Sequence, residues 1–236
     1  MRTSAPDRLT MVLRRPIITV LGDSHAGIFN RIRRQGRLPG TWLDVLSVPA
    51  ATAFGLANPN SSTNALTQFS DLLDRTPGHR RTLFMLGEVD CGFLIWHRAM
   101  TRGTSVESEF QQSLQRYTGF LEEQMAKGHD RIGLVSVAPS TIDDYARWKG
   151  LDSARGKVTA SIEERTALTV AYNHELAAWA RRTASAFLDL DPDLLDPTTG
   201  LVAPRFIHPD PTDHHLDPDA LVEVLVERIP QLLARW

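Results

Sequence analysis

The chain has 236 residues, of which 42% are hydrophobic and 23% charged, and its formal net charge is −2. This is ordinary globular composition, and the length suits one α/β domain. The nearly balanced charge argues against nucleic acid as a partner. The single cysteine, Cys91, excludes a disulfide framework within the chain and is typical of a reducing compartment.

The apolar runs of the sequence are too short to enter a membrane. A membrane span needs about 20 apolar residues, and the run at residues 16–21 is shorter than the apolar core of a signal peptide, about 7–15 residues. We therefore expect a cytoplasmic protein with no membrane partner. Residues 1–15 are expected to form a loose, charged leader and residues 16–236 a single domain. The sequence indicates no cofactor, and it does not reveal the oligomeric state.

Short apolar runs alternate along the chain with amphipathic segments. The first run, residues 17–21, is apolar on both faces, as strands buried in a parallel sheet are. The expected strands are residues 17–21, 42–48, 82–86, 131–137 and 186–190. The expected helices are residues 24–34, 65–74, 105–127, 162–183 and 221–233. This alternation predicts an α/β fold, with helices on both faces of a five-stranded parallel sheet.

Ligands of such sheets bind beyond the carboxyl ends of the strands. Ser24 follows the first expected strand directly, within Gly22-Asp23-Ser24-His25, and opens the first helix. The free N–H groups at a helix start favour developing negative charge, so Ser24 is a candidate nucleophile. The alternative is that Ser24 or Asp23 only caps the helix.

A serine nucleophile needs a base, and His215 is the best placed histidine. It lies in the loop between the last strand and the last helix, which the fold can bring over Ser24. Asp213 or Asp210 could orient its imidazole and fix the tautomer. The alternative is that this loop binds a metal or caps the last helix.

Four blocks in chain order give the sequence a resemblance to the SGNH (GDSL) hydrolases. They are Gly22-Asp23-Ser24, a glycine in the second loop, Gly87-x-x-Asp90, and a late Asp/His pair. The resemblance implies a flavodoxin-like three-layer α/β/α sandwich and ester hydrolysis by a Ser-His-Asp set. It also implies an oxyanion hole built from the serine N–H, a glycine N–H and an asparagine side chain, and such donors are worth about 10²–10³ in rate each.

Carried over, Ser24 matches the nucleophile, His215 the base and Gly55 the second-block glycine. The chain departs from the family at two places. Val89 stands where the third block has asparagine, and Asp213 lies two residues before His215 where the family has three. A valine cannot donate to an oxyanion, so the polar loop is the expected replacement, through Asn58, Asn60 or Asn64. Glu88 and Asp90 either contact substrate or bond to loop backbone.

Two other functions fit parts of the pattern. Asp23 and His25 also resemble the opening metal ligands of calcineurin-type metallophosphoesterases, with Asp90 and His214 or His215 completing a two-metal site. Against this, the Gly-Asn-His block of that family is missing. The departures from the SGNH pattern could also mark a binding protein that does no chemistry. Our main expectation is a serine esterase without a bound metal.

The substrate expected from the resemblance is an acylated small molecule, sugar esters included. Hydrolysis and acyl transfer share one acyl-enzyme, so the sequence does not separate them.

Cys91 is expected to be a buried, inert thiol rather than a nucleophile. Four aromatic residues could line a substrate pocket or belong to the core: Phe54, Phe93, Trp96 and Trp148.

Overall fold

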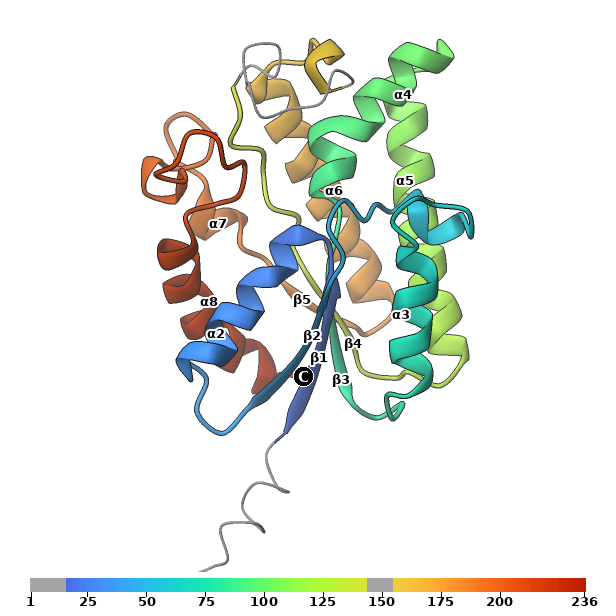
Figure 1. Cartoon of the computed structure of the whole chain (residues 1–236), viewed down its shortest axis with the longest axis vertical. Helices are drawn as coiled ribbons and strands as arrows, with labels where there is room; N and C mark the ends of the chain where they lie inside the picture. Colours follow the sequence, from blue (N-terminus) through green and yellow to red (C-terminus); the bar gives the residue numbers. More distant parts are fainter. Residues whose placement is uncertain (1–15, 144–154) are drawn as a thin grey trace, which may run out of the picture.

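The computed structural model describes residues 16–143 and 155–236, and it contains the expected parallel sheet (Figure 1). Its strands are β1 (Ile17–Gly22), β2 (Trp42–Ser47), β3 (Arg81–Met85), β4 (Ile132–Val135) and β5 (Ala186–Leu188). They are parallel and lie in the order β2-β1-β3-β4-β5. The expected leader and Trp148 lie outside the described residues.

Helices cover both faces of the sheet and complete the three layers (Figure 1). On one face, α2 (Ile28–Gln35) and α8 (Pro218–Leu233) bury Phe29 and Leu225 in one apolar cluster with the sheet. On the other, α3 (Ala65–Asp74), α5 (Val106–Ala126) and α6 (Ile162–Arg182) bury Phe69, Tyr117 and Leu176 in a second cluster. The predicted α/β/α sandwich is therefore confirmed.

Local signals explain where the two longest helices begin. Ser105 caps α5 by accepting the N–H of Ser108. Ser161 and Glu164 form a reciprocal capping box at the start of α6. Each cap satisfies N–H groups that have no partner inside the helix.

The structure departs from the expected elements after β1 and after β3. Residues Ser24–Gly27 form a short 3-10 turn, and regular α-helix begins only at Ile28. A π-helical turn (Asp90–Leu94) and α4 (Ile95–Arg102) follow β3, where no helix was predicted. A short helix, α7 (Asp191–Leu194), also follows β5. The alternation of polar and apolar residues in these short segments is too brief to give a helical signal.

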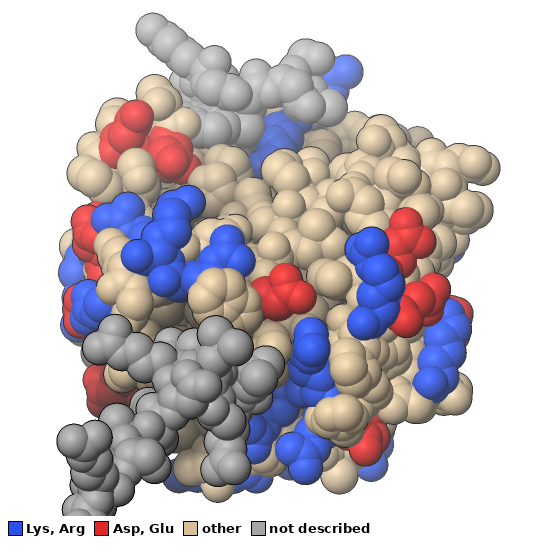
Figure 2. All heavy atoms as spheres, turned by 60° about the horizontal axis from the view of Figure 1, so that its bottom comes forward, with Lys and Arg blue, Asp and Glu red and all other residues tan. Residues whose placement is uncertain are grey.

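Charged side chains of both signs are mixed over the surface seen in Figure 2. This agrees with the small net charge of −2 and does not suggest a nucleic-acid-binding face on that side. None of the described helices has both the length and the apolar character needed to cross a lipid bilayer.

The carboxyl end of β1 packs tightly against the end of β3, and Gly22 makes this possible. A Cβ atom on Gly22 would lie 1.9 Å from the carbonyl oxygen of Met85. The next residue, Asp23, donates its N–H to the same oxygen at 3.2 Å. Glycine is therefore required here by the close approach of two backbones.

We expect Gly22→Ala to destabilise the fold by about 1–3 kcal/mol, because the new methyl group forces the two strand ends apart. Urea unfolding measures the change. Gly119→Ala is the matched control, since no atom lies within 4 Å of the added Cβ in α5 and alanine is the better helix former. A Gly22→Ala protein as stable as the wild type would contradict this account of the strand exit.

Candidate active site

Ser24 lies at the exit of β1 and its hydroxyl is not used as a helix cap. Asp23 takes that role, since its Oδ1 accepts the N–H of His25 at 2.9 Å. Neither the hydroxyl nor the N–H of Ser24 has a hydrogen-bond partner among the described residues. The half-buried Ser24 thus keeps a donor and an acceptor that no other described residue uses.

His215 and Asp213 form a dyad in the loop before α8. The Oδ1 atom of Asp213 lies 2.6 Å from Nδ1 of His215 and also accepts the His215 N–H at 2.9 Å. Asp210 accepts hydrogen bonds from Thr212 instead. Of the two candidate aspartates, Asp213 is therefore the one that contacts His215. With Nδ1 held by a carboxylate, Nε2 of His215 is left to accept a proton.

The charge of Asp213 is favoured by its surroundings. Burial by itself raises the pKa of this carboxyl, but hydrogen bonds from His215 and the nearby imidazoles outweigh burial and lower it. Asp213 is therefore ionised at neutral pH. An ionised partner stabilises the imidazolium that forms when His215 takes up a proton.

One cavity of about 280 Å³ joins Ser24 to this dyad. Its wall comes from the β1 exit, from α2 and from the loop and first turn of α8. The lining residues are Ser24, His25, Gly27, Ile28, Arg31, Arg34, His208, Asp213, His215, Leu216, Pro218 and Leu221. The structure thus brings together Ser24, His215 and Asp213, although the serine and the dyad come from opposite ends of the sequence.

Two further imidazoles pack against His215. The ring centroids of His25 and His214 lie 4.6 and 4.2 Å from that of His215. Burial lowers the pKa of His214 to about 4, so this ring is neutral at neutral pH. Burial also acts to lower the pKa of His25, but the carboxylates of Asp23, Glu88 and Asp213 outweigh it and the net shift is upward.

Glu88 is buried beside these rings and is 3% exposed. Its Oε2 has no hydrogen-bond partner among the residues that the structure describes. Its negative charge acts on both His25 and His214. Glu88 thus belongs to the electrostatic surroundings of the dyad, although it does not line the cavity.

The structure gives other partners to Gly55, Asp90 and Asn60. The Gly55 N–H donates to Oγ1 of Thr52 at 2.9 Å, and the exposed Asn60 donates its N–H to Asn58. Asp90 accepts the N–H of Ala53 at 2.8 Å and the Ser113 hydroxyl at 3.1 Å. None of the three lines the Ser24 cavity. The contacts of these residues lie within the second loop and between that loop and α5, and their expected role in binding the oxyanion or substrate stays a prediction.

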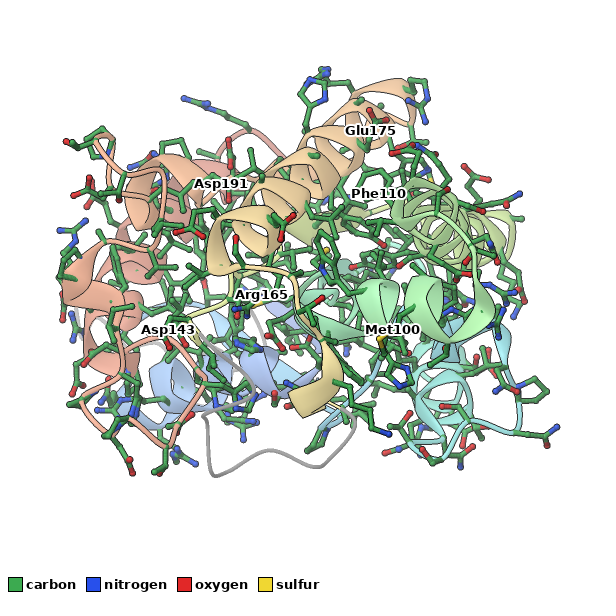
Figure 3. The ribbon with its side chains drawn as sticks, turned by 90° about the horizontal axis from the view of Figure 1, so that it is seen from above. Met100, Phe110, Asp143, Arg165, Glu175 and Asp191 are labelled. Carbon is green, nitrogen blue, oxygen red and sulfur yellow. The ribbon has the colours of Figure 1, made fainter. Side chains whose placement is uncertain are left out.

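Arg165 and the segment after β4 hold the His214-His215 loop in place. This role of Arg165 was not predicted from the sequence. The buried Arg165 on α6 donates to Oγ of Ser140 at 2.7 Å and to the carbonyl oxygens of Ile142 and Asp143. Figure 3 shows Arg165 and Asp143 on the side of the sheet where the strands end. Within the same segment, Thr141 donates its hydroxyl to the His214 carbonyl at 2.8 Å. A lone arginine in a helical pattern carries no sequence signal for this task.

The residues present could also hold a cation. One ligand atom from each of Asp213, His214 and His215 lies within 4.8 Å of the others. The Asp23 and His25 pair expected for a metallophosphoesterase fits less well, because both Asp23 oxygens already accept backbone N–H groups, from His25 and Gly87. Asp90 lies in its own buried network.

Cys91 is fully buried, and burial together with nearby carboxylates raises its pKa well above the ordinary value. The expected burial of this thiol is confirmed, and a raised pKa disfavours the reactive thiolate. Phe54 is buried in the core cluster, whereas Phe93 and Trp96 are partly buried beside Ile142 and Val158. None of the three lines the Ser24 cavity.

No model of a protein family matches the chain, and no curated protein matches it either. Solved structures do match over nearly its whole length. A GDSL-like lipase from Bacteroides thetaiotaomicron has a TM-score of 0.61 at 12% identity, covering 94% of this chain and 90% of its own. A Bacteroides fragilis protein assigned provisionally as an acylhydrolase has a TM-score of 0.62 at 12% identity, covering 96% and 93%. The acetyl xylan esterase AlAXEase has a TM-score of 0.55 at 14% identity, covering 91% and 98%. The chain therefore has the fold of the SGNH hydrolases, as its four sequence blocks implied.

We expect Asp90→Asn to change how stability depends on pH. Burial raises the pKa of Asp90 to about 7 from 3.8 in the unfolded chain. The folded chain therefore holds this proton more tightly, and Asp90 disfavours folding progressively as pH rises from about 4 to about 7. The asparagine side chain of the variant cannot ionise, so the stability of the variant relative to wild type should increase across this range.

Urea unfolding of both proteins at several pH values between 4 and 8 measures this difference. His214 titrates in both proteins and cancels in the comparison. A stability difference that stays constant with pH would show that Asp90 does not take up a proton in the folded chain.

Proposed function

We propose that the chain is a serine ester hydrolase that works through an acyl-enzyme on Ser24. The observation that supports this most strongly is the shared cavity, which is lined both by Ser24 and by the Asp213–His215 dyad. The SGNH fold supports it, since the solved neighbours include a GDSL-like lipase and an acetyl xylan esterase.

In the proposed reaction, Nε2 of His215 removes the proton from the Ser24 hydroxyl as its oxygen attacks the acyl carbonyl. Asp213 stabilises the imidazolium through Nδ1. The imidazolium then gives its proton to the departing alcohol, which leaves the acyl group on Ser24. Water, activated by the same imidazole, releases the acid and restores the serine.

The oxyanion of the tetrahedral intermediate needs hydrogen-bond donors. The Ser24 N–H is without a partner among the described residues and lies at the start of the turn before α2. Its position gives it the favourable field of the helix start. Val89 supplies no side-chain donor, so backbone N–H groups supply more of the stabilisation here than in the family pattern.

The substrate that fits best is a small O- or N-acylated molecule, with sugar esters included. The cavity of about 280 Å³ combines apolar walls from Ile28, Leu216 and Leu221 with polar groups at the dyad. A short acyl chain suits such a space. Transfer of the acyl group to an alcohol or amine in place of water uses the same intermediate.

The single cysteine, which is free and buried, supports a cytoplasmic location.

We expect Ser24→Ala to reduce hydrolysis of p-nitrophenyl acetate by about 10³-fold or more, because the acyl-enzyme cannot form. Initial rates with and without EDTA measure this, and EDTA should leave the wild-type rate unchanged. Ser62→Ala, at an exposed serine of the second loop, is the matched control and should retain full activity. Loss of the wild-type rate in EDTA would instead favour a metal enzyme that uses the Asp213-His214-His215 cluster.

Asp213→Asn and Asp210→Asn form a matched pair in the same loop. The first should lower kcat by about 10³-fold, because an asparagine cannot stabilise the imidazolium and favours the wrong tautomer. The second should change kcat only slightly, since Asp210 bonds to Thr212 rather than to His215. Equal losses in both variants would mean that the loop, and not the dyad, carries the effect.

A further inference from the structure

A second cavity, of about 410 Å³, lies where the 52–61 loop meets α4 and α5. It shares no lining residue with the Ser24 cavity. Its wall combines three arginines with hydroxyl, amide and apolar groups. The lining residues are Thr52, Phe54, Gly55, Ala57, Asn58, Ser61, Leu94, Arg98, Arg102 and Arg116.

The charge of this cavity is unbalanced. No acidic residue lines it. Glu109, which is fully buried, bonds to Nε of Arg98 at 2.6 Å and accepts the Thr104 hydroxyl with its other oxygen. Among the described residues, Arg102 and Arg116 form no ion pair. The three guanidinium groups of the lining therefore carry more charge than the Arg98–Glu109 ion pair balances, and their mutual repulsion is relieved when an anion binds between them.

The arginines are also held in place. The Arg98 guanidinium lies 3.8 Å from the centroid of the Phe54 ring, and that of Arg116 lies 5.7 Å from the same ring. Such cation–π contacts fix the guanidinium planes. The ion pair with the buried Glu109 fixes Arg98 further and leaves its terminal Nη groups without a hydrogen-bond partner among the residues described. Donors that are already oriented bind an anion at a smaller entropic cost.

We propose that this cavity binds the phosphate or sulfate group of an organic anion. The forked donors of arginine match the oxygens of such a group. Oγ1 of Thr52 already accepts the Gly55 N–H, so its own proton is available to donate to the ligand. The volume exceeds that of a bare phosphate, and Leu94 offers an apolar surface for an attached organic group.

This site does not depend on the proposed esterase activity. The 52–61 loop that forms its wall is attached to α5 through the Asp90 contacts with Ala53 and Ser113. Ser24 takes no part in these contacts. Phosphate binding should therefore be the same in the wild type and in Ser24→Ala.

Isothermal titration calorimetry with sodium phosphate, against sodium chloride at equal ionic strength, tests the proposal on the full chain. The wild type should bind phosphate saturably, and the Arg102→Gln/Arg116→Gln protein should bind it about tenfold more weakly or worse. Arg181→Gln/Arg182→Gln removes the same charge at the exposed end of α6 and should bind as the wild type does. Thermal unfolding of each protein verifies that it is folded.

Two outcomes would overturn the proposal. The first is an absence of phosphate binding beyond that seen with chloride. The second is an equal loss in both double variants, which would mean that net charge and not this cavity attracts the anion.

Discussion

The buried carboxylate of Asp23 accepts two backbone hydrogen bonds that set the position of Ser24 at the end of β1. It is 1% exposed, accepts the His25 N–H with Oδ1, and accepts the Gly87 N–H with Oδ2 at 3.2 Å. The first bond shapes the turn that follows β1, and the second ties this turn to the end of β3. Because Asp23 performs the capping, Ser24 is left with a hydroxyl and an N–H that nothing else in the described structure uses.

The Asp23 carboxylate also affects the pKa of His25, one of the two histidines that pack against His215. His25 follows Ser24 in the chain. Its Nδ1 lies 3.3 Å from Oδ1 of Asp23, and its ring packs against that of His215. Burial alone would lower the pKa of this ring, but the nearby carboxylates of Asp23, Glu88 and Asp213 outweigh burial and raise it. His214 is instead neutral because burial dominates. The base therefore packs between one imidazole whose pKa is raised and one whose pKa is lowered.

The features that could be predicted from the sequence are those that depend on one strand or helix alone. The buried strands, the long amphipathic helices and the placement of Ser24 at a strand exit all follow from local patterns. The dyad was also predicted, although Asp210 and Asp213 could be separated only by the side-chain contacts. The partners of Gly55 and Asp90 were not predictable, because they depend on how one loop folds upon itself and on α5. Arg165 was missed for the same reason, since its partners follow another strand.

Covalent labelling of the Ser24 hydroxyl is the sharpest test of its proposed role as the nucleophile. The protein would be treated with a fluorophosphonate probe, digested, and searched for the adduct by tandem mass spectrometry. We expect one stoichiometric adduct on the Ser24 hydroxyl, formed much more slowly when His215 is replaced by alanine. An adduct on another residue, or ester hydrolysis that continues while Ser24 remains unlabelled, would contradict it.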